Sequence, residues 1–171
     1  MSISSNALRH SYRARLEALA QKSPSDPEEQ ADWAKYVSVL ISGYIEQSFK
    51  EILLEFVSSH EISRLDKYIS DTWPESRNMK ISNIDFILRS FDLSWSEKFN
   101  RWIESKENYK SEINSLISSR NDIAHGKEAN TTNVTLRSMR YRLAISLELI
   151  DELGSIICGG NEESLIDELA S

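Results

Sequence analysis

The sequence predicts an all-α bundle of about six helices. Only five of its 171 residues are glycine and three are proline, which is too few to separate the many short strands of a β-sandwich or barrel. Apolar residues recur at spacings of three and four along most of the chain, as in helices with one buried face. With 40% hydrophobic and 27% charged residues, the composition is that of one globular domain. We therefore expect a single helical domain over residues 1–158 and an acidic, mobile tail over 159–171.

Two helices are expected in the first third of the chain. Residues 8–19 carry apolar side chains at helical spacing and predict the first helix. The second begins at Pro27, because proline is favoured in the first turn of a helix. The preceding residue, Asp26, can cap the free N–H groups of that turn. Its apolar face continues from Trp33 to Val57, which predicts one long helix.

Three shorter helices are expected in the middle of the chain. Residues 61–68 form a plausible short helix before a loop. Ser82 with Asp85, and Ser94 with Glu97, resemble capping pairs in front of apolar runs. Each pair therefore predicts the start of a helix.

Two further helices complete the predicted bundle. One starts near Lys106 and ends at Gly126, since glycine most readily takes the left-handed conformation that closes a helix. The last starts near Thr135 and has an apolar face that reaches Leu153.

Charge, cysteine content and hydropathy limit the functional classes. The net charge of -7 argues against a nonspecific DNA coat, although residues 98–142 hold nine Lys or Arg against five Asp or Glu. One cysteine, Cys158, and three histidines cannot build a disulfide framework or a cysteine-rich zinc site. No apolar run is long enough to cross a bilayer. We expect a cytoplasmic protein without metal, cofactor or membrane partner.

An arginine interrupts the apolar face of the helix that ends at Gly126. Extending the stripe from Ile113 through Leu116 leads to Arg120, and a buried guanidinium is costly unless it is paired or binds an anion. His125 follows five residues later, about 140° away on an ideal helix, and loosening of the last turn would let the two head groups converge. Arginine binds phosphate oxygens and histidine exchanges protons near neutral pH, which are the needs of metal-free RNA cleavage.

The run Arg-Asn-Asp-Ile-Ala-His at 120–125 resembles the Arg-x4-6-His signature of the HEPN superfamily, the higher eukaryote and prokaryote nucleotide-binding domains. The similarity extends to Gly43-Tyr44-Ile45-Glu46 in the long early helix, to His125-Gly126-Lys127, and to Val134-Thr135-Leu136 at the next helix start. This order resembles the RiboL-PSP-HEPN branch over about residues 30–155.

The resemblance implies an endoribonuclease that works as a homodimer, with a role as a toxin or phage-defence effector. Arg120 would hold and polarise the scissile phosphate, His125 would exchange protons, and Asn121 would orient one of them, with Glu46 and Asp122 in supporting roles. Two chains would supply the base and the acid that cleavage needs, since each signature offers one histidine. Where related toxins carry a modifiable tyrosine, this chain has Lys127, so control by that modification is not expected.

The expected partners are RNA, a second copy of the chain, and an antitoxin or regulatory protein. Basic residues that flank Arg120 form a candidate RNA track, and they equally fit solvated helix faces. The RNA-binding candidates are Lys127, Arg137, Arg140 and Lys110.

Two alternatives to the ribonuclease stay open at this stage. The domain can be a catalytically silent HEPN module that binds nucleotide or RNA, or that scaffolds a protein. It can also be a plain helical interaction protein, in which Arg120 pairs with a buried acid such as Glu46 and His125 only caps its helix. The tryptophans are expected in the core, with base stacking left open for Trp73.

Overall fold

The computed structural model describes residues 5–61, 63–73 and 78–159, and within them it is all-α, as the sequence predicted. It contains seven α-helices in these ranges, which correspond to the segments predicted above under an overall expectation of about six, and one short 3-10 helix. No strand occurs in the described ranges. The elements are α1 (Ser5–Gln21), α2 (Pro27–Ser59), α3 (Ser63–Thr72), α4 (Ile81–Phe91), α5 (Leu93–Glu104), α6 (Tyr109–Ala124), η1 (Glu128–Asn130) and α7 (Leu136–Cys158). The expected acidic tail lies outside the described residues from 160 onward.

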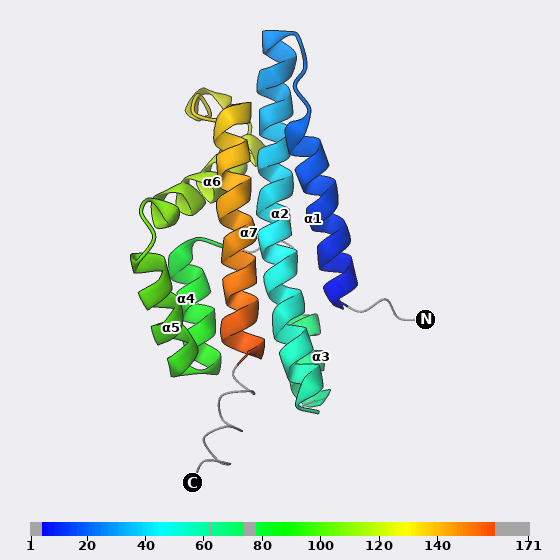
Figure 1. Ribbon diagram of the computed structural model, residues 1–171, viewed down its shortest axis with the longest axis vertical. Coiled ribbons are helices and arrows are strands. Elements are labelled where there is room, and N and C mark those ends of the chain that lie inside the picture. The colour runs from blue at the N-terminus through cyan, green and yellow to red at the C-terminus, as the bar shows by residue number, and fades with distance from the viewer. Residues whose placement is uncertain (1–4, 62, 74–77, 160–171) are drawn as a thin grey trace.

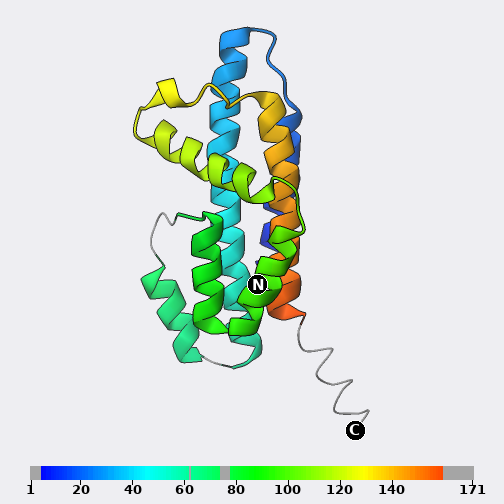
Figure 2. The ribbon, with the colours of Figure 1, turned by 90° about the vertical axis from the view of Figure 1, so that its left-hand side faces the viewer.

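Three helices form the long axis of the bundle. α2 and α7 run side by side in the same direction, and α1 packs against both in the opposite direction (Figure 1). α4 and α5 pair with each other, and α3 packs against α2. α6 crosses α2 and α7 obliquely, and η1 and the following loop turn back toward the start of α7 (Figure 2). The oblique crossing leaves the end of α6 at the edge of the bundle.

Several helix ends follow the sequence prediction. The Asp26 carboxylate accepts hydrogen bonds from the Glu28 and Glu29 backbone N–H groups, both at 3.0 Å. Thr135 caps α7 and forms a reciprocal capping box with Ser138. Gly126 has φ +68 directly after α6, the left-handed conformation expected of a residue that ends a helix.

The two capping pairs expected for α4 and α5 are not the ones used. α4 begins without a side-chain cap, and its Ile81 N–H donates to Asn114 Oδ1 on α6 at 3.0 Å. α5 is capped by Asp92, whose carboxylate accepts from the Ser94 N–H at 2.7 Å. Asp85 instead accepts hydrogen bonds from side chains of α5. Contacts between elements thus override the local capping pattern.

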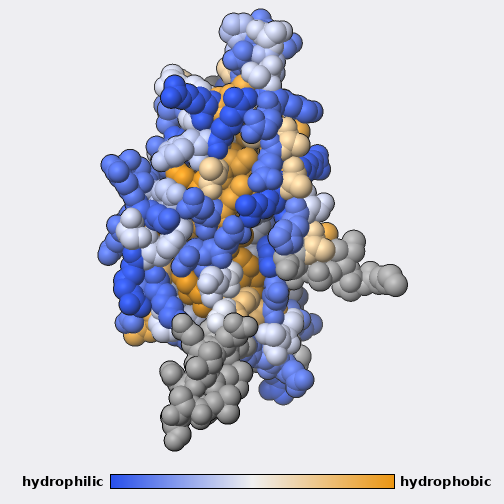
Figure 3. All heavy atoms as spheres, viewed as in Figure 1, coloured by the Kyte–Doolittle hydropathy of each residue, from blue (hydrophilic) through white to orange (hydrophobic). Residues whose placement is uncertain are grey.

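The core is continuous along the bundle, and the tryptophans belong to it. Trp95 is buried, while Trp33, Trp73 and Trp102 are partly buried and pack against the core. The Trp73 ring meets Phe49 edge-on at 6.2 Å between centroids, so packing accounts for the one tryptophan that was left open. On the face in Figure 3, hydrophobic residues are visible mainly as a narrow, interrupted band along α7 and α2. Among the described residues, no helix has both the length and the apolarity needed to span a membrane.

Candidate functional site

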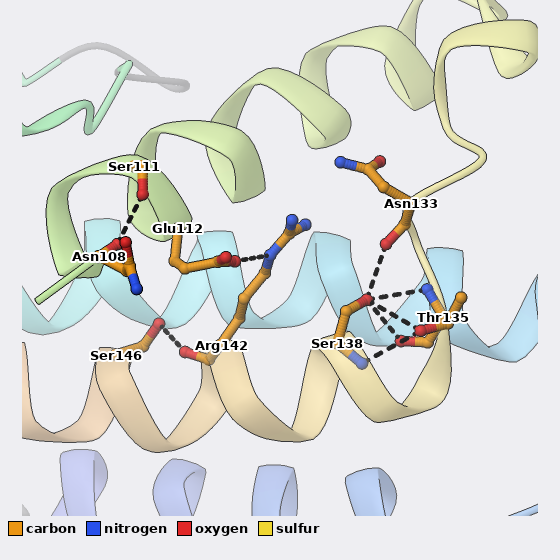
Figure 4. A network of polar contacts seen from close by, with 8 residues as sticks. All are labelled: Asn108, Ser111, Glu112, Asn133, Thr135, Ser138, Arg142 and Ser146. Atoms are coloured by element: carbon orange, nitrogen blue, oxygen red, sulfur yellow. Dashed lines mark hydrogen bonds and ion pairs between the residues drawn. The ribbon is translucent and has the colours of Figure 1, made fainter.

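The first half of α6 is tied to its neighbours by polar contacts. Glu112 accepts a hydrogen bond from Arg142 Nε at 2.9 Å, and Arg142 is only 4% exposed between α6 and α7 (Figure 4). Tyr109 donates to Glu148 of α7 at 2.9 Å. These bonds fix where α6 lies, and therefore where its far end presents the 120–125 segment.

The 120–125 segment forms the last turn of α6 and the tight reversal that follows. α6 ends at Ala124, and the His125 N–H donates to the Asn121 carbonyl at 3.1 Å. The Lys127 N–H then donates to the Asp122 carbonyl at 2.8 Å. The reversal at Gly126 leaves the His125 side chain exposed to solvent.

Arg120 lies on the apolar side of α6, as the stripe predicted, but it is not enclosed. Ile113 and Leu116 on the same side are fully buried, whereas Arg120 is half-buried. Its Nη1 donates to Asn121 Oδ1 at 3.2 Å. The structure thus brings Arg120 and Asn121 together at a surface beside the core.

Arg120 and His125 occupy different positions around the axis of α6. Five residues of an ideal helix turn through about 140° beyond one full revolution. No hydrogen bond joins the two side chains within the described chain, and His125 follows the helix as its C-cap residue. The convergence of the two head groups within one chain therefore stays a prediction.

The basic residues near the signature divide into two groups. Lys110, Lys127 and Arg137 are exposed. Arg140 instead donates to the Ala20 and Gln21 carbonyls at 2.8 and 3.3 Å. It satisfies free carbonyls at the end of α1, so its guanidinium is less available to RNA than the sequence suggested.

The comparison with protein families decides the class. The RiboL-PSP-HEPN family model matches residues 8–159, which covers the bundle from α1 to the end of α7. The chain belongs to the RiboL-PSP-HEPN family. No curated protein and no solved structure matches it. HEPN domains are in general ribonucleases or nucleotide-binding modules.

The two residues that were expected to have supporting roles, Glu46 and Asp122, occupy different environments in this HEPN domain. Glu46 is buried in the middle of α2, with 6% of its surface exposed. Asp122 is half-buried and lines a surface cavity of about 240 Å³ between α6 and the loop that follows η1. The described residues contain no group of three or more His, Cys, Asp or Glu side chains placed to hold a metal ion.

The cavity is the part of the HEPN domain that sequence reasoning missed. α6 contributes Asn114, Ser118, Ser119 and Asp122 to its wall. The signal was present as small polar residues on the side of α6 opposite its apolar stripe. These residues form a cavity wall only because the loop after η1 turns back over that side of α6.

Proposed function

We propose that this HEPN domain is a metal-independent endoribonuclease that acts as a homodimer, with a role as a toxin or phage-defence effector. The observation that carries the proposal is the placement of the signature in a member of this family. Arg120 and Asn121 are half-buried and His125 is exposed. A phosphodiester can therefore reach all three without unfolding of the domain.

The chemistry requires one proton acceptor and one proton donor. A neutral imidazole takes the proton of the RNA 2′-hydroxyl, and that oxygen attacks the adjacent phosphorus. The bond to the 5′-oxygen breaks, and an imidazolium gives that oxygen a proton. The products are a 2′,3′-cyclic phosphate and a 5′-hydroxyl. Arg120 would stabilise the charge on the phosphorane oxygens, and such help commonly contributes about 100-fold or more.

The geometry of one protomer supports a site shared by two. One signature supplies one histidine, and His125 lies five residues after Arg120, about 140° away around an ideal helix. A two-fold axis near the ends of two α6 helices would bring His125 and Arg120 of both chains to one phosphodiester. The half-exposed Arg120 beside the core offers a surface for such a contact.

A second candidate function is a silent HEPN module that binds nucleotide or RNA or scaffolds a protein. The charge distribution favours it, because the whole chain carries a net charge of -7. In addition, Arg140 and Arg142 are engaged inside the fold, which reduces the basic surface next to the signature.

The test uses the purified full chain and an RNA with one scissile position. We expect cleavage in EDTA that leaves a 2′,3′-cyclic phosphate, and no cleavage when the scissile nucleotide is 2′-deoxy. Cleavage of the deoxy substrate contradicts the mechanism, and absence of cleavage on all RNAs favours the silent module. Mixing His125→Ala chains with wild-type chains tests the shared site, because a site that needs the histidines of both chains is inactive in the mixed dimer.

A further inference from the structure

The polar cavity beside the signature shares a helix face with His125. Asn114, Ser118 and His125 are separated by four and seven residues, which places them within about 40° of one another around α6. The opposite wall is formed by Asn130 at the end of η1 and by Asn133 in the loop that follows. Figure 4 shows the Asn133 amide pointing from that loop toward α6. A group held in the cavity would thus lie on the His125 side of the helix.

The cavity serines differ from three other helical serines in how their hydroxyls are used. Ser90, Ser111 and Ser146 each donate their hydroxyl to a carbonyl three or four residues earlier, at 2.7–2.8 Å. Ser118 and Ser119 make no such bond within the described chain, although Ser119 is only 4% exposed. Ser118 and Ser119 both line the cavity, so their hydroxyls are available there to a hydrogen-bonding ligand.

The side-chain amide of Asn114 also has a group that is not used within the fold. Asn114 uses Oδ1 to accept the Ile81 N–H at 3.0 Å, which fixes the orientation of its amide. Its Nδ2 is then free to donate. The Asp122 carboxylate adds an acceptor at the same wall. The cavity wall therefore carries both hydrogen-bond donors and acceptors.

The residue types that line the cavity indicate the chemical class of its ligand. No lysine or arginine lines the cavity, so a phosphate would find no charge partner there. Amides, hydroxyls and one carboxylate match the edge of a nucleobase and the hydroxyls of a ribose. A volume of about 240 Å³ is below the range of about 300–1,000 Å³ for drug-sized ligands, which fits a single nucleoside.

We propose that this cavity binds one nucleoside of the RNA strand, next to the phosphodiester on which His125 acts. As a substrate subsite it rests on the proposed function, but nucleoside binding can be measured without cleavage. The cavity then sets the base preference of the enzyme, and the signature supplies the chemistry.

The first experiment measures kcat/KM on RNAs that differ only in the base beside the scissile bond. Ser118→Ala, Ser119→Ala and Asn133→Ala are each expected to lower kcat/KM for the preferred base by roughly 3- to 10-fold, the effect of one hydrogen bond. The other bases change less, so the preference narrows. Ser111→Ala is the matched control on α6, because its hydroxyl is bound to the Asn108 carbonyl. Cleavage with an unchanged base preference in all three variants overturns the subsite and leaves the ribonuclease intact.

The second experiment measures binding without turnover. Backbone amide NMR spectra are recorded with adenosine, guanosine, cytidine and uridine, each up to its solubility limit. We expect shifts at Ser118, Ser119 and Asn133 for at least one nucleoside, and loss of those shifts in Ser119→Ala. No cavity shift with any of the four overturns the proposal. Cavity shifts from a chain that cleaves no RNA support a nucleoside site and contradict the ribonuclease function.

Discussion

The two halves of α6 differ in how their polar side chains are used. In the first half, Tyr109, Glu112 and Asn114 each bond to another element, namely α7 for the first two and the start of α4 for the third. In the second half, the only side-chain hydrogen bond within the described chain joins Arg120 to its neighbour Asn121. The polar side chains in the first half of α6 therefore hold the helix against its neighbours, whereas those in the second half remain available to a ligand.

The difference between the two halves of α6 indicates which residues contribute to stability and which are available for function. A polar group that bonds to a neighbouring helix contributes to the free energy of folding, and its removal leaves a partner unsatisfied. A polar group that bonds to nothing in the fold contributes little to folding and is available to a ligand. Substitutions in the first half should therefore change stability, and substitutions in the second half should change activity.

The largest expected effect is on cleavage, in the second half. Arg120→Ala and His125→Ala should each lower kcat/KM by at least about 100-fold, because they remove phosphate stabilisation and proton transfer. The free energy of unfolding should change by less than about 1 kcal/mol, as measured by urea titration. His60→Ala is the matched control, since His60 is the exposed C-cap residue of α2. If a variant unfolds, the substituted residue contributes to the stability of the fold and its assignment to the site is contradicted.

The next effect is on stability, in the first half. Glu112→Ala should lower the free energy of unfolding by about 2–3 kcal/mol, because it leaves the Arg142 guanidinium buried without its partner. Arg142→Met should cost less, since Glu112 is 30% exposed and can be hydrated. Urea unfolding of both variants checks this order. An equal cost for the two would mean that the ion pair does not anchor α6.

A smaller effect on activity is expected at Asn121. Its Oδ1 accepts from Arg120, so Asn121→Ala should loosen the guanidinium and lower kcat by about 10-fold. The midpoint of thermal unfolding should stay within about 2 °C. Unchanged kcat in Asn121→Ala would remove this residue from the site.

The smallest effect is expected at Tyr109. Loss of its bond to Glu148 in Tyr109→Phe should cost about 0.5–1 kcal/mol of stability. Burial, and then the bond to Glu148, raise the pKa of Tyr109 above 10.0. The contribution is therefore fully present below pH 10 and disappears as the pH rises through the folded-state pKa. Urea titrations of wild type and variant at neutral and alkaline pH measure this, and a difference that grows with pH would contradict it.

The sequence was sufficient where a feature depends on neighbours in the chain. Asp26 and Pro27 start α2, and Gly126 closes α6, because capping and the left-handed conformation are decided within a few residues. The placement of Arg120 beside the core also followed from helical spacing alone. The family resemblance agreed with the family model over residues 8–159, because both depend on the order of helices and on the signature.

The sequence was insufficient where elements far apart in the chain share a group. Asp85 matched a local capping pattern, yet it accepts from Ser96 and Asn100 on α5. Arg140 matched a basic track, yet it bonds to carbonyls about 120 residues away. The polar cavity likewise needs the return of the loop after η1. Residue spacing along the chain does not predict which distant residue a polar side chain will hydrogen-bond.

The parallel packing of α2 and α7 has a consequence for biosynthesis. α2 emerges early from the ribosome, but its partner α7 spans residues 136–158, and Arg142 of α7 is the residue that fixes α6. At a synthesis rate of about 5–20 residues per second, the nascent chain therefore carries the signature segment for seconds before it has a platform. The proposed ribonuclease would therefore lack the support of α7 for its signature segment during this interval.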